Sequence, residues 1–180
     1  MSATSTAAWS TFESPVGPLG LVAGAEGLMA VRFPGGPALD PAGRDDDALA
    51  EVAAQLGEYF AAERRSFELS LTPRRGSGLE RAVWSELERI PYGETVSYGQ
   101  LAERVGHTGD HECVREVAAA VGRTPTPIVV PCHRVIGADG SLTGYGGGLE
   151  RKRALLDLER RAAAGLPHQP PWEFRQARLI

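Results

Sequence analysis

Two capping boxes in the second half of the chain constrain its fold more than any other feature. Ser77 is followed three residues later by Glu80, and Ser97 is followed in the same way by Gln100. The Ser side chain accepts a hydrogen bond from a backbone N–H in the first turn of a helix, and the Glu or Gln side chain accepts one from the backbone N–H of the Ser, so each pair predicts a helix N-terminus. Pro91 stops the first helix at about residue 90. The second half is therefore predicted to contain short, separate helices.

The next helix ends are also marked in the sequence. Gly106 can end the second helix after residue 105, because glycine readily adopts the left-handed conformation that follows a helix. A third helix is predicted from near Asp110 through Val121, since its apolar residues share one face. Two short helices joined by a turn predict a helix-turn-helix.

The first half has a different pattern. Short apolar runs at residues 9–13, 19–23 and 28–33, separated by Gly and Pro, predict an antiparallel meander. Residues 34–47 are rich in Pro, Gly and Asp and predict an exposed loop. Apolar residues at helical spacing from Leu49 to Phe60 predict a helix, and residues 67–71 predict a short strand. The first half is thus predicted to be a small α+β unit that ends within residues 72–78.

After the third helix, prolines at 125 and 127 predict an extended segment. It leads into a predicted buried strand at 128–130 that ends at Cys132. Residues 135–142 predict a hairpin around the turn Asp139-Gly140. A last helix is predicted at 149–163, with its leucines packed and with Arg151, Lys152 and Arg153 facing solvent or phosphate.

The charge distribution bears on possible partners. The net charge of −4 disfavours nucleic acid at first sight, because phosphate binding depends on Lys and Arg. Residues 1–72, however, carry 4 Arg against 10 acidic residues, while residues 73–180 carry 15 basic residues against 13 acidic ones. All basic residues except Lys152 are arginine, which suits bidentate phosphate and base contacts. A GC-rich genome explains the arginine bias equally well.

Neither a secretory signal nor an apolar run of membrane-spanning length is present, so a cytoplasmic location is expected. The two cysteines, Cys113 and Cys132, have no Cys or His pair at zinc-ligand spacing nearby. Both are expected to be free thiols, and neither a metal nor a cofactor is expected.

Cys132 directly precedes a histidine and an arginine. A cysteine attacks as the thiolate, and neighbouring cationic or proton-accepting groups favour that form. Side chains of adjacent strand residues point to opposite faces, so His133 would need a turn or a water to reach the sulfur. An isolated Cys-His pair is more often a core cysteine beside an accidental histidine.

Three longer segments change that balance. They are 127–136, which contains Pro131-Cys132-His133-Arg134, the glycine-rich run 144–149, and residues 93–102. Together they closely resemble the O6-alkylguanine-DNA alkyltransferases, also called methylated-DNA–protein-cysteine methyltransferases. The resemblance covers residues 77–162, and the N-terminal region is similar only in general layout. It implies an α+β fold with a small N-terminal α/β (RNase H-like) domain at 1–74, a C-terminal winged helix-turn-helix domain at 75–164, and a tail at 165–180.

The resemblance also implies an activity. A monomer would bind double-stranded DNA, flip an alkylated guanine or alkylated thymine out of the stack, and accept the alkyl group irreversibly on Cys132. His133 would take the thiol proton through a water, and Glu159 would polarise that histidine. Neither a cofactor nor a membrane is implied.

Further residues receive roles by the same resemblance. Arg115 would enter the base stack, and Tyr98 would crowd the target phosphate and donate to the base. Alanines on the third helix would let it press into the minor groove. The DNA-facing set is Tyr98, Arg115, Ala118, Ala119, Val121 and Thr124. The base pocket would use the backbone of Cys132, Val135 and Gly146, with Tyr145 as a wall and Lys152 nearby. Without the resemblance, Arg115 is equally a surface ion-pair partner of Glu112 or Glu116, and Tyr98 a core residue.

Two departures from the family pattern stand out. Thr124 occupies a place where the family usually has asparagine, and its hydroxyl can form only part of the amide's hydrogen-bond network. The turn at 106–112 is longer than usual and places His107 and His111 near Cys113. Three other functions remain open at this point: a lesion sensor, which would lack the acceptor cysteine, a transcription regulator that uses the helix-turn-helix alone, and a Cys-His-Glu thiol hydrolase.

Overall fold

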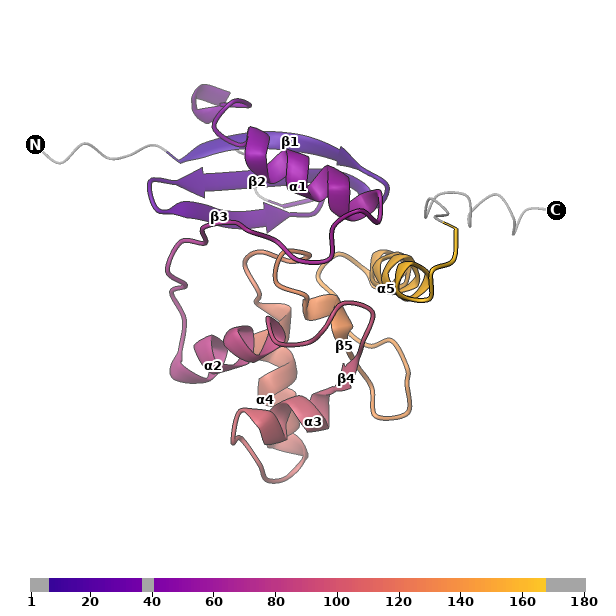
Figure 1. Cartoon of the computed structure of the whole chain (residues 1–180). Coiled ribbons are helices and arrows are strands. Elements are labelled where there is room, and N and C mark those ends of the chain that lie inside the picture. Colours follow the sequence, from indigo (N-terminus) through magenta and orange to yellow (C-terminus); the bar gives the residue numbers. More distant parts are fainter. Residues whose placement is uncertain (1–6, 37–40, 168–180) are drawn as a thin grey trace, which may run out of the picture.

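The N-terminal unit is a three-stranded antiparallel meander covered on one face by a helix (Figure 1). The computed structural model describes residues 7–36 and 41–167. Strands β1 (Ala8–Ser14), β2 (Gly17–Gly24) and β3 (Gly27–Arg32) pair in chain order, and α1 (Ala50–Phe60) follows a short 3-10 turn at Pro41–Gly43. The predicted strands and helix are confirmed.

The predicted strand at 67–71 is wrong. This segment runs beside β3 but makes a single bridge, between Leu28 and Leu71. The Leu28 N–H donates to Ser70 O at 2.8 Å, and the Thr72 N–H donates to Leu28 O at 3.0 Å. Further along β3 the N–H of Val31 donates instead to Pro125 O at 3.0 Å. Two segments share the edge of β3, so neither forms a full ladder.

The second half contains four α-helices, and the first two begin where the capping boxes predict. The four helices are α2 (Gly78–Leu87), α3 (Tyr98–Arg104), α4 (His111–Gly122) and α5 (Leu149–Ala163). Both capping boxes form, and the side chain of Asp110 caps α4 by accepting from the Glu112 N–H. Helix α2 ends at Leu87, earlier than expected, and continues as a turn closed by the Ile90 N–H on Leu87 O. Helices α3 and α4 form the predicted helix-turn-helix.

The predicted strand at 128–130 is also wrong. Ile128 has a positive φ of 75°, and the Val130 N–H turns back to Thr126 O at 2.9 Å. The reason lies in the packing, because Ile128 enters the N-terminal core whereas Val130 enters the C-terminal core. The chain must turn between these two residues so that each side chain can enter its own core. Cys132 therefore lies in a 3-10 turn, Cys132–Arg134, and not at the end of a strand.

The predicted hairpin at 135–142 is wrong in its pairing. The turn itself forms, with Gly140 at a φ of 81° and the Gly137 N–H on Ser141 O at 2.8 Å. Strand β5 (Val135–Ile136), however, pairs in parallel with β4 (Val96–Ser97), the short strand directly before α3. This pairing joins the segment that follows Cys132 to the helix-turn-helix.

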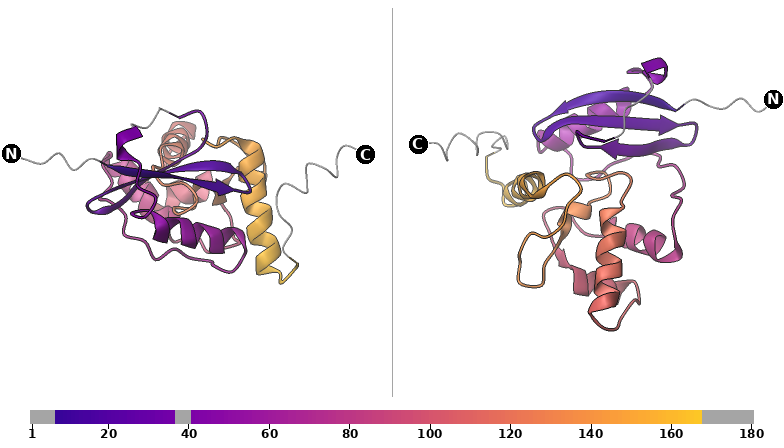
Figure 2. Two further views of the ribbon diagram at one scale, coloured as in Figure 1. Left: turned by 90° about the horizontal axis from the view of Figure 1, so that it is seen from above. Right: turned by 180° about the vertical axis from the view of Figure 1, so that it is seen from behind.

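Two hydrophobic cores result, and α5 contributes to the N-terminal one. Leu155 and Leu158 of α5 pack with the meander and α1, whereas α2, α3 and α4 form the second core. Figure 2 shows α5 along the flank of the molecule, against the N-terminal unit. The unit boundaries at 74 and 164 stay predictions. Trp172 and Phe174 of the predicted tail lie outside the described residues. No helix in the described part of the chain is long and apolar enough to cross a membrane.

Candidate active site

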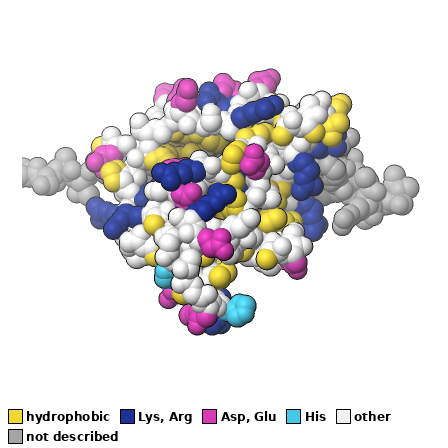
Figure 3. Space-filling model, turned by 60° about the horizontal axis from the view of Figure 1, so that its bottom comes forward, with side chains coloured by type: hydrophobic (Ala, Val, Ile, Leu, Met, Phe, Trp, Pro, Cys, Tyr) yellow, Lys and Arg dark blue, Asp and Glu magenta, His cyan; other side chains and the backbone are white. Residues whose placement is uncertain are grey.

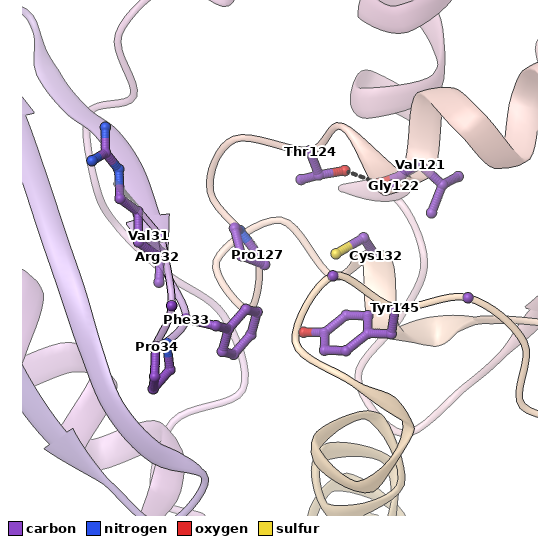
Figure 4. Close-up of a pocket in the computed structure, with 14 residues that line it drawn as sticks. Val31, Arg32, Phe33, Pro34, Val121, Gly122, Thr124, Pro127, Cys132 and Tyr145 are labelled. Atoms are coloured by element: carbon purple, nitrogen blue, oxygen red, sulfur yellow. Dashed lines mark hydrogen bonds between the residues drawn. The ribbon is translucent and has the colours of Figure 1, made fainter. Parts of the chain in front are cut away.

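Cys132 lies in the wall of a pocket between the two units (Figure 4). Its side chain is 5% exposed, and its sulfur points into a cavity of about 450 Å³. The C-terminal unit lines one side with Val121, Gly122, Thr124, Pro127, Cys132, Gly144, Tyr145 and Gly146. The N-terminal unit lines the other with the end of β3 and the residues after it, Val31, Arg32, Phe33, Pro34, Gly35 and Gly36. A reactive sulfur thus faces a cavity of the size that small-molecule sites have.

Burial keeps this thiol protonated at rest. Desolvation raises the pKa of Cys132 to about 11, against the opposing effects of the Thr124 hydroxyl, the Lys152 charge and the Tyr145 hydroxyl. At neutral pH the sulfur therefore needs a base to become a thiolate.

Glu159 of α5 is the centre of the polar network beside that thiol. Its carboxylate is fully buried and accepts hydrogen bonds from His133 Nε2 at 2.8 Å, from Arg134 Nε and Nη2 at 2.8 and 2.9 Å, and from the Gly93 N–H at 3.1 Å. The Tyr59 hydroxyl adds a further bond at 2.8 Å. A buried carboxylate is stable only when its lone pairs are satisfied in this way.

The network indicates which ring nitrogen of His133 carries a hydrogen. Burial disfavours the charge on Glu159, but the charges and hydrogen bonds of His133 and Arg134 outweigh it and hold the pKa of Glu159 well below its usual range. An ionised carboxylate only accepts, so His133 Nε2 must carry the hydrogen that it shares with Glu159. In neutral His133 the lone pair is then on Nδ1, which is buried and has no hydrogen-bond partner among the described residues. Nδ1 is the atom that can receive a proton.

Sequence reasoning missed two members of this network, Tyr59 and Arg134. Tyr59 is fully buried on α1, where a tyrosine at helical spacing is indistinguishable from a core aromatic. Arg134 is 6% exposed, and its Nη1 also donates to Ile90 O at 2.6 Å. Its position directly after Cys132 and His133 was the sequence signal that could have identified it. A buried arginine requires an anion, which here is Glu159.

Lys152 also differs from expectation. Its side chain is fully buried, not solvent-facing, and Nζ donates to Thr143 O at 2.8 Å. Burial lowers the pKa of Lys152 to about 8, although the nearby Cys132 opposes this. The ammonium lies over the ring of Tyr98, 5.7 Å from its centroid, and the Tyr98 hydroxyl donates to the same Thr143 O at 3.2 Å. Arg151 likewise donates to protein carbonyls, those of Val16 and Gly147.

The predicted DNA-facing residues of α4 fall into two groups. Arg115 is 74% exposed and pairs with Glu112, and Ala119 is exposed. Val121 is buried but lines the pocket, as does Thr124. Thr124 Oγ1 donates to Val121 O at 2.7 Å, so it secures the end of α4 beside the thiol. The helix therefore presents an arginine at its outer part and ends at the pocket.

Comparison with known families matches both units. Residues 8–73 match the ribonuclease-like domain of 6-O-methylguanine DNA methyltransferase, and residues 78–161 match its DNA binding domain. This chain belongs to that family. The predicted α+β fold, with a ribonuclease-like N-terminal domain ahead of a DNA-binding domain, is thereby confirmed.

The sequence similarity to individual relatives extends over nearly their whole length. The methylated-DNA–protein-cysteine methyltransferases of Methanosarcina acetivorans and Mycobacterium bovis are 43% and 45% identical, over 84% and 87% of this chain and 97% and 94% of theirs. A crystal structure of Mycobacterium tuberculosis OGT in complex with DNA matches with a TM-score of 0.78 and 44% identity, covering 86% of this chain and 93% of that one.

In this methyltransferase the N-terminal wall of the pocket was not predicted. Phe33 packs edge-on against Tyr145, with ring centroids 5.5 Å apart. A Cβ at position 147 would lie 2.8 Å from the Phe33 ring, so Gly147 permits this contact. The width of the pocket is thus set by both units.

Proposed function

We propose that this chain repairs alkylated DNA by moving the alkyl group from the O6 atom of guanine to Sγ of Cys132, once per molecule. The observation that carries this proposal is the position of the thiol, at the wall of the pocket with the His133–Glu159 pair behind it. Relatives of similar length that are named methylated-DNA–protein-cysteine methyltransferases support it. We propose that the same pocket also admits O4-alkylthymine.

The reaction requires groups of this chain and one water molecule. His133 Nδ1 takes the thiol proton through a water, and the thiolate attacks the alkyl carbon. A C–S bond forms as the C–O bond breaks, and the electron pair of that bond stays on the guanine. The Gly146 N–H stabilises the developing charge on the oxygen, and the base regains a proton equal to the one that the thiol lost. The thioether has no route back to a thiol, so each chain acts once.

DNA binding is assigned to the exposed side of α4, with Tyr98 at its edge and small residues, Ala118 and Ala119, against the minor groove. Arg115 would leave Glu112 and fill the space of the flipped base. Exposed ion pairs contribute little to stability, so this exchange is inexpensive. The backbone of Cys132 and Val135 would hold the guanine amine, and Tyr145 would form the pocket wall. In this proposal residues 75–164 form the DNA-binding and alkyl-acceptor domain, residues 1–74 form a structural domain, and residues 165–180 form a tail.

A single mass measurement tests the proposal. The full chain is incubated with an oligonucleotide duplex that contains one O6-methylguanine, and its intact mass is determined. One added methyl group per chain is expected, located on Cys132, absent from Cys132→Ser and unchanged in the matched control Cys113→Ser. Several repaired bases per chain would indicate a hydrolase instead. Binding without any mass change would indicate a lesion sensor.

A further inference from the structure

We propose that His107, Cys113 and Glu116 form a binding site for one Zn²⁺ ion at the tip of the helix-turn-helix. One ligand atom from each side chain, an imidazole nitrogen, the thiol sulfur and a carboxylate oxygen, lies within 4.8 Å of the other two. The site is separate from the alkyl-acceptor pocket, and the proposal does not depend on the proposed function.

The turn and the helix bring these ligands together from two directions. Cys113 and Glu116 are three residues apart on α4, so their side chains share one face of the helix. His107 lies in the turn after α3, where its N–H donates to Ala102 O at 2.9 Å. Its ring reaches across the turn, and Nε2 lies 2.6 Å from Glu116 Oε2. The backbone of His107 is therefore tied to α3, while its imidazole contacts α4.

The backbone of the turn is shaped around the cysteine sulfur. A Cβ at position 109 would lie 2.7 Å from Sγ of Cys113, closer than any side chain tolerates. Gly109 thus lets the turn pass close to the sulfur. Only a residue without a side chain permits this approach.

The donor set selects the kind of ion. Nitrogen and sulfur ligands with one carboxylate suit Zn²⁺, whereas Mg²⁺ and Ca²⁺ prefer oxygen alone. Zinc–ligand bonds of about 2.0–2.3 Å place ligand atoms of a tetrahedron roughly 3.3–3.6 Å apart, which small side-chain rotations reach from the present arrangement. Metal binding would deprotonate the thiol outright, so Cys113 coordinates as a thiolate. Three protein ligands leave the fourth position to a water.

The site is open to solvent. The side chains of His107 and Glu116 are 33% and 51% exposed, and Figure 3 shows histidine and acidic side chains at the lower end of the molecular face. The expectation of no metal rested on linear Cys and His spacing. That spacing does not reveal a site whose ligands face each other across a turn and include a glutamate.

Metal binding at this site would rigidify the turn between α3 and α4. A metal ion would join the loop at 106–110 to the first turns of α4, the helix that carries Arg115. In the full-length Cys132→Ser protein, which lacks the acceptor thiol, Co²⁺ is expected to bind once per chain with a thiolate-to-metal absorption band. Added Zn²⁺ should displace the Co²⁺ and slow amide exchange at 106–110.

Variants decide whether these residues are the ligands. In the Cys132→Ser background, Cys113→Ser should abolish the band, and His107→Ala and Glu116→Gln should each weaken binding by at least about 10-fold, since even outer-shell losses have effects of that size. His111→Ala is the matched control, because it lies in the same region but outside the cluster, and it should bind as before. Equal affinity in His107→Ala, or no band at all, would overturn the proposal.

A second measurement uses no variant of the metal ligands, and so it does not depend on whether such variants fold. In the unmodified chain, Zn²⁺ should protect Cys113 from a thiol-alkylating reagent, as read by peptide mass. Protection of Cys132 alone, or of neither cysteine, would contradict the assignment.

Discussion

The hydroxyl of Tyr59 donates a 2.8 Å hydrogen bond to Glu159, across 100 residues of sequence and from one structural unit to the other. Burial and the charge of Glu159 raise the pKa of Tyr59 well above its usual value, so the phenol stays protonated and remains a donor. The N-terminal unit therefore supplies one of the hydrogen bonds that hold the carboxylate behind His133. We therefore expect Tyr59 to act as a positioning residue, through Glu159 and His133.

Tyr59→Phe should separate this role from simple packing. The ring contacts with Phe60, Phe67 and Tyr92 are retained, while the hydrogen bond to a buried charge is lost. We expect a loss of about 1.5–3 kcal/mol in the free energy of unfolding, measured with urea, and a slower single-turnover alkyl transfer. Tyr92→Phe is the matched control, since its buried hydroxyl has no partner among the described residues. Equal effects of the two substitutions would refute a positioning role.

Glu159→Gln should impair both stability and transfer. Removing the charge leaves Arg134 buried without its anion, which we expect to destabilise the fold by about 3–5 kcal/mol. Loss of the partner of His133 should slow transfer by about 100-fold or more. Glu150→Gln, at an exposed position of the same helix, is the control and should transfer at the normal rate.

The stability difference between wild type and Glu159→Gln should also depend on pH. The folded-state pKa of Glu159 is depressed, so its contribution is fully present above the unfolded value near 4.5 and is lost as the pH falls. Urea unfolding at a series of pH values should therefore show a gap that narrows below about pH 4.5. A gap that stays constant on acidification would argue against an ionised Glu159.

The reactivity of Cys132 should rise late in a pH titration. With no DNA bound, burial raises the thiol pKa to about 11, so alkylation by iodoacetamide should keep increasing above pH 9. Because the folded state holds this proton more tightly than the unfolded chain, the thiol's contribution to stability is complete below pH 9 and is lost as the pH rises towards 11. Peptide mass spectrometry follows the site, and urea-unfolded protein is the reference. A plateau at or below pH 8 in the folded protein would show that the resting thiol is already activated.

Thr124→Val should reveal how far threonine replaces the usual asparagine. The shape is kept, but the hydroxyl no longer donates to Val121 O or lowers the pKa of Cys132. We expect about 1 kcal/mol less stability and a slower reaction of the thiol with iodoacetamide at pH 8. Thr143→Val is the matched control. It makes the same substitution at a residue whose backbone carbonyl, and not its hydroxyl, makes the contacts described. An unchanged thiol reactivity in Thr124→Val would assign Thr124 to the helix end alone.

The sequence predicted the parts of this fold that depend on local signals. Capping boxes at Ser77 and Ser97 placed two helices because a cap is a short-range hydrogen bond. Residues 67–71 and 128–130 have the apolar composition of strands, but composition reveals neither that a second segment shares the edge of β3 nor which core a side chain enters. Ile128 and Val130 enter different cores, and only the tertiary fold decides that.

The candidate site divides in the same way. The roles of Cys132, His133 and Glu159 are predictions from the motif resemblance, and the structure shows a hydrogen bond between His133 and Glu159. Tyr59 and Phe33 were not assigned, since they reach the site from another unit and have no neighbouring motif. The sequence predicts that Lys152 faces solvent or phosphate, whereas its side chain is buried and its ammonium donates to the backbone carbonyl of Thr143.

Helix α5 packs its leucines into the N-terminal core while its glutamate completes the network of the other unit. Neither unit therefore has a complete interior of its own, and loss of one should remove support from the other. Although the protein resembles two modules in series, it should consequently unfold on heating in one cooperative transition. Spectroscopic signals from Trp9 in the meander and Trp84 in α2 should change at the same temperature.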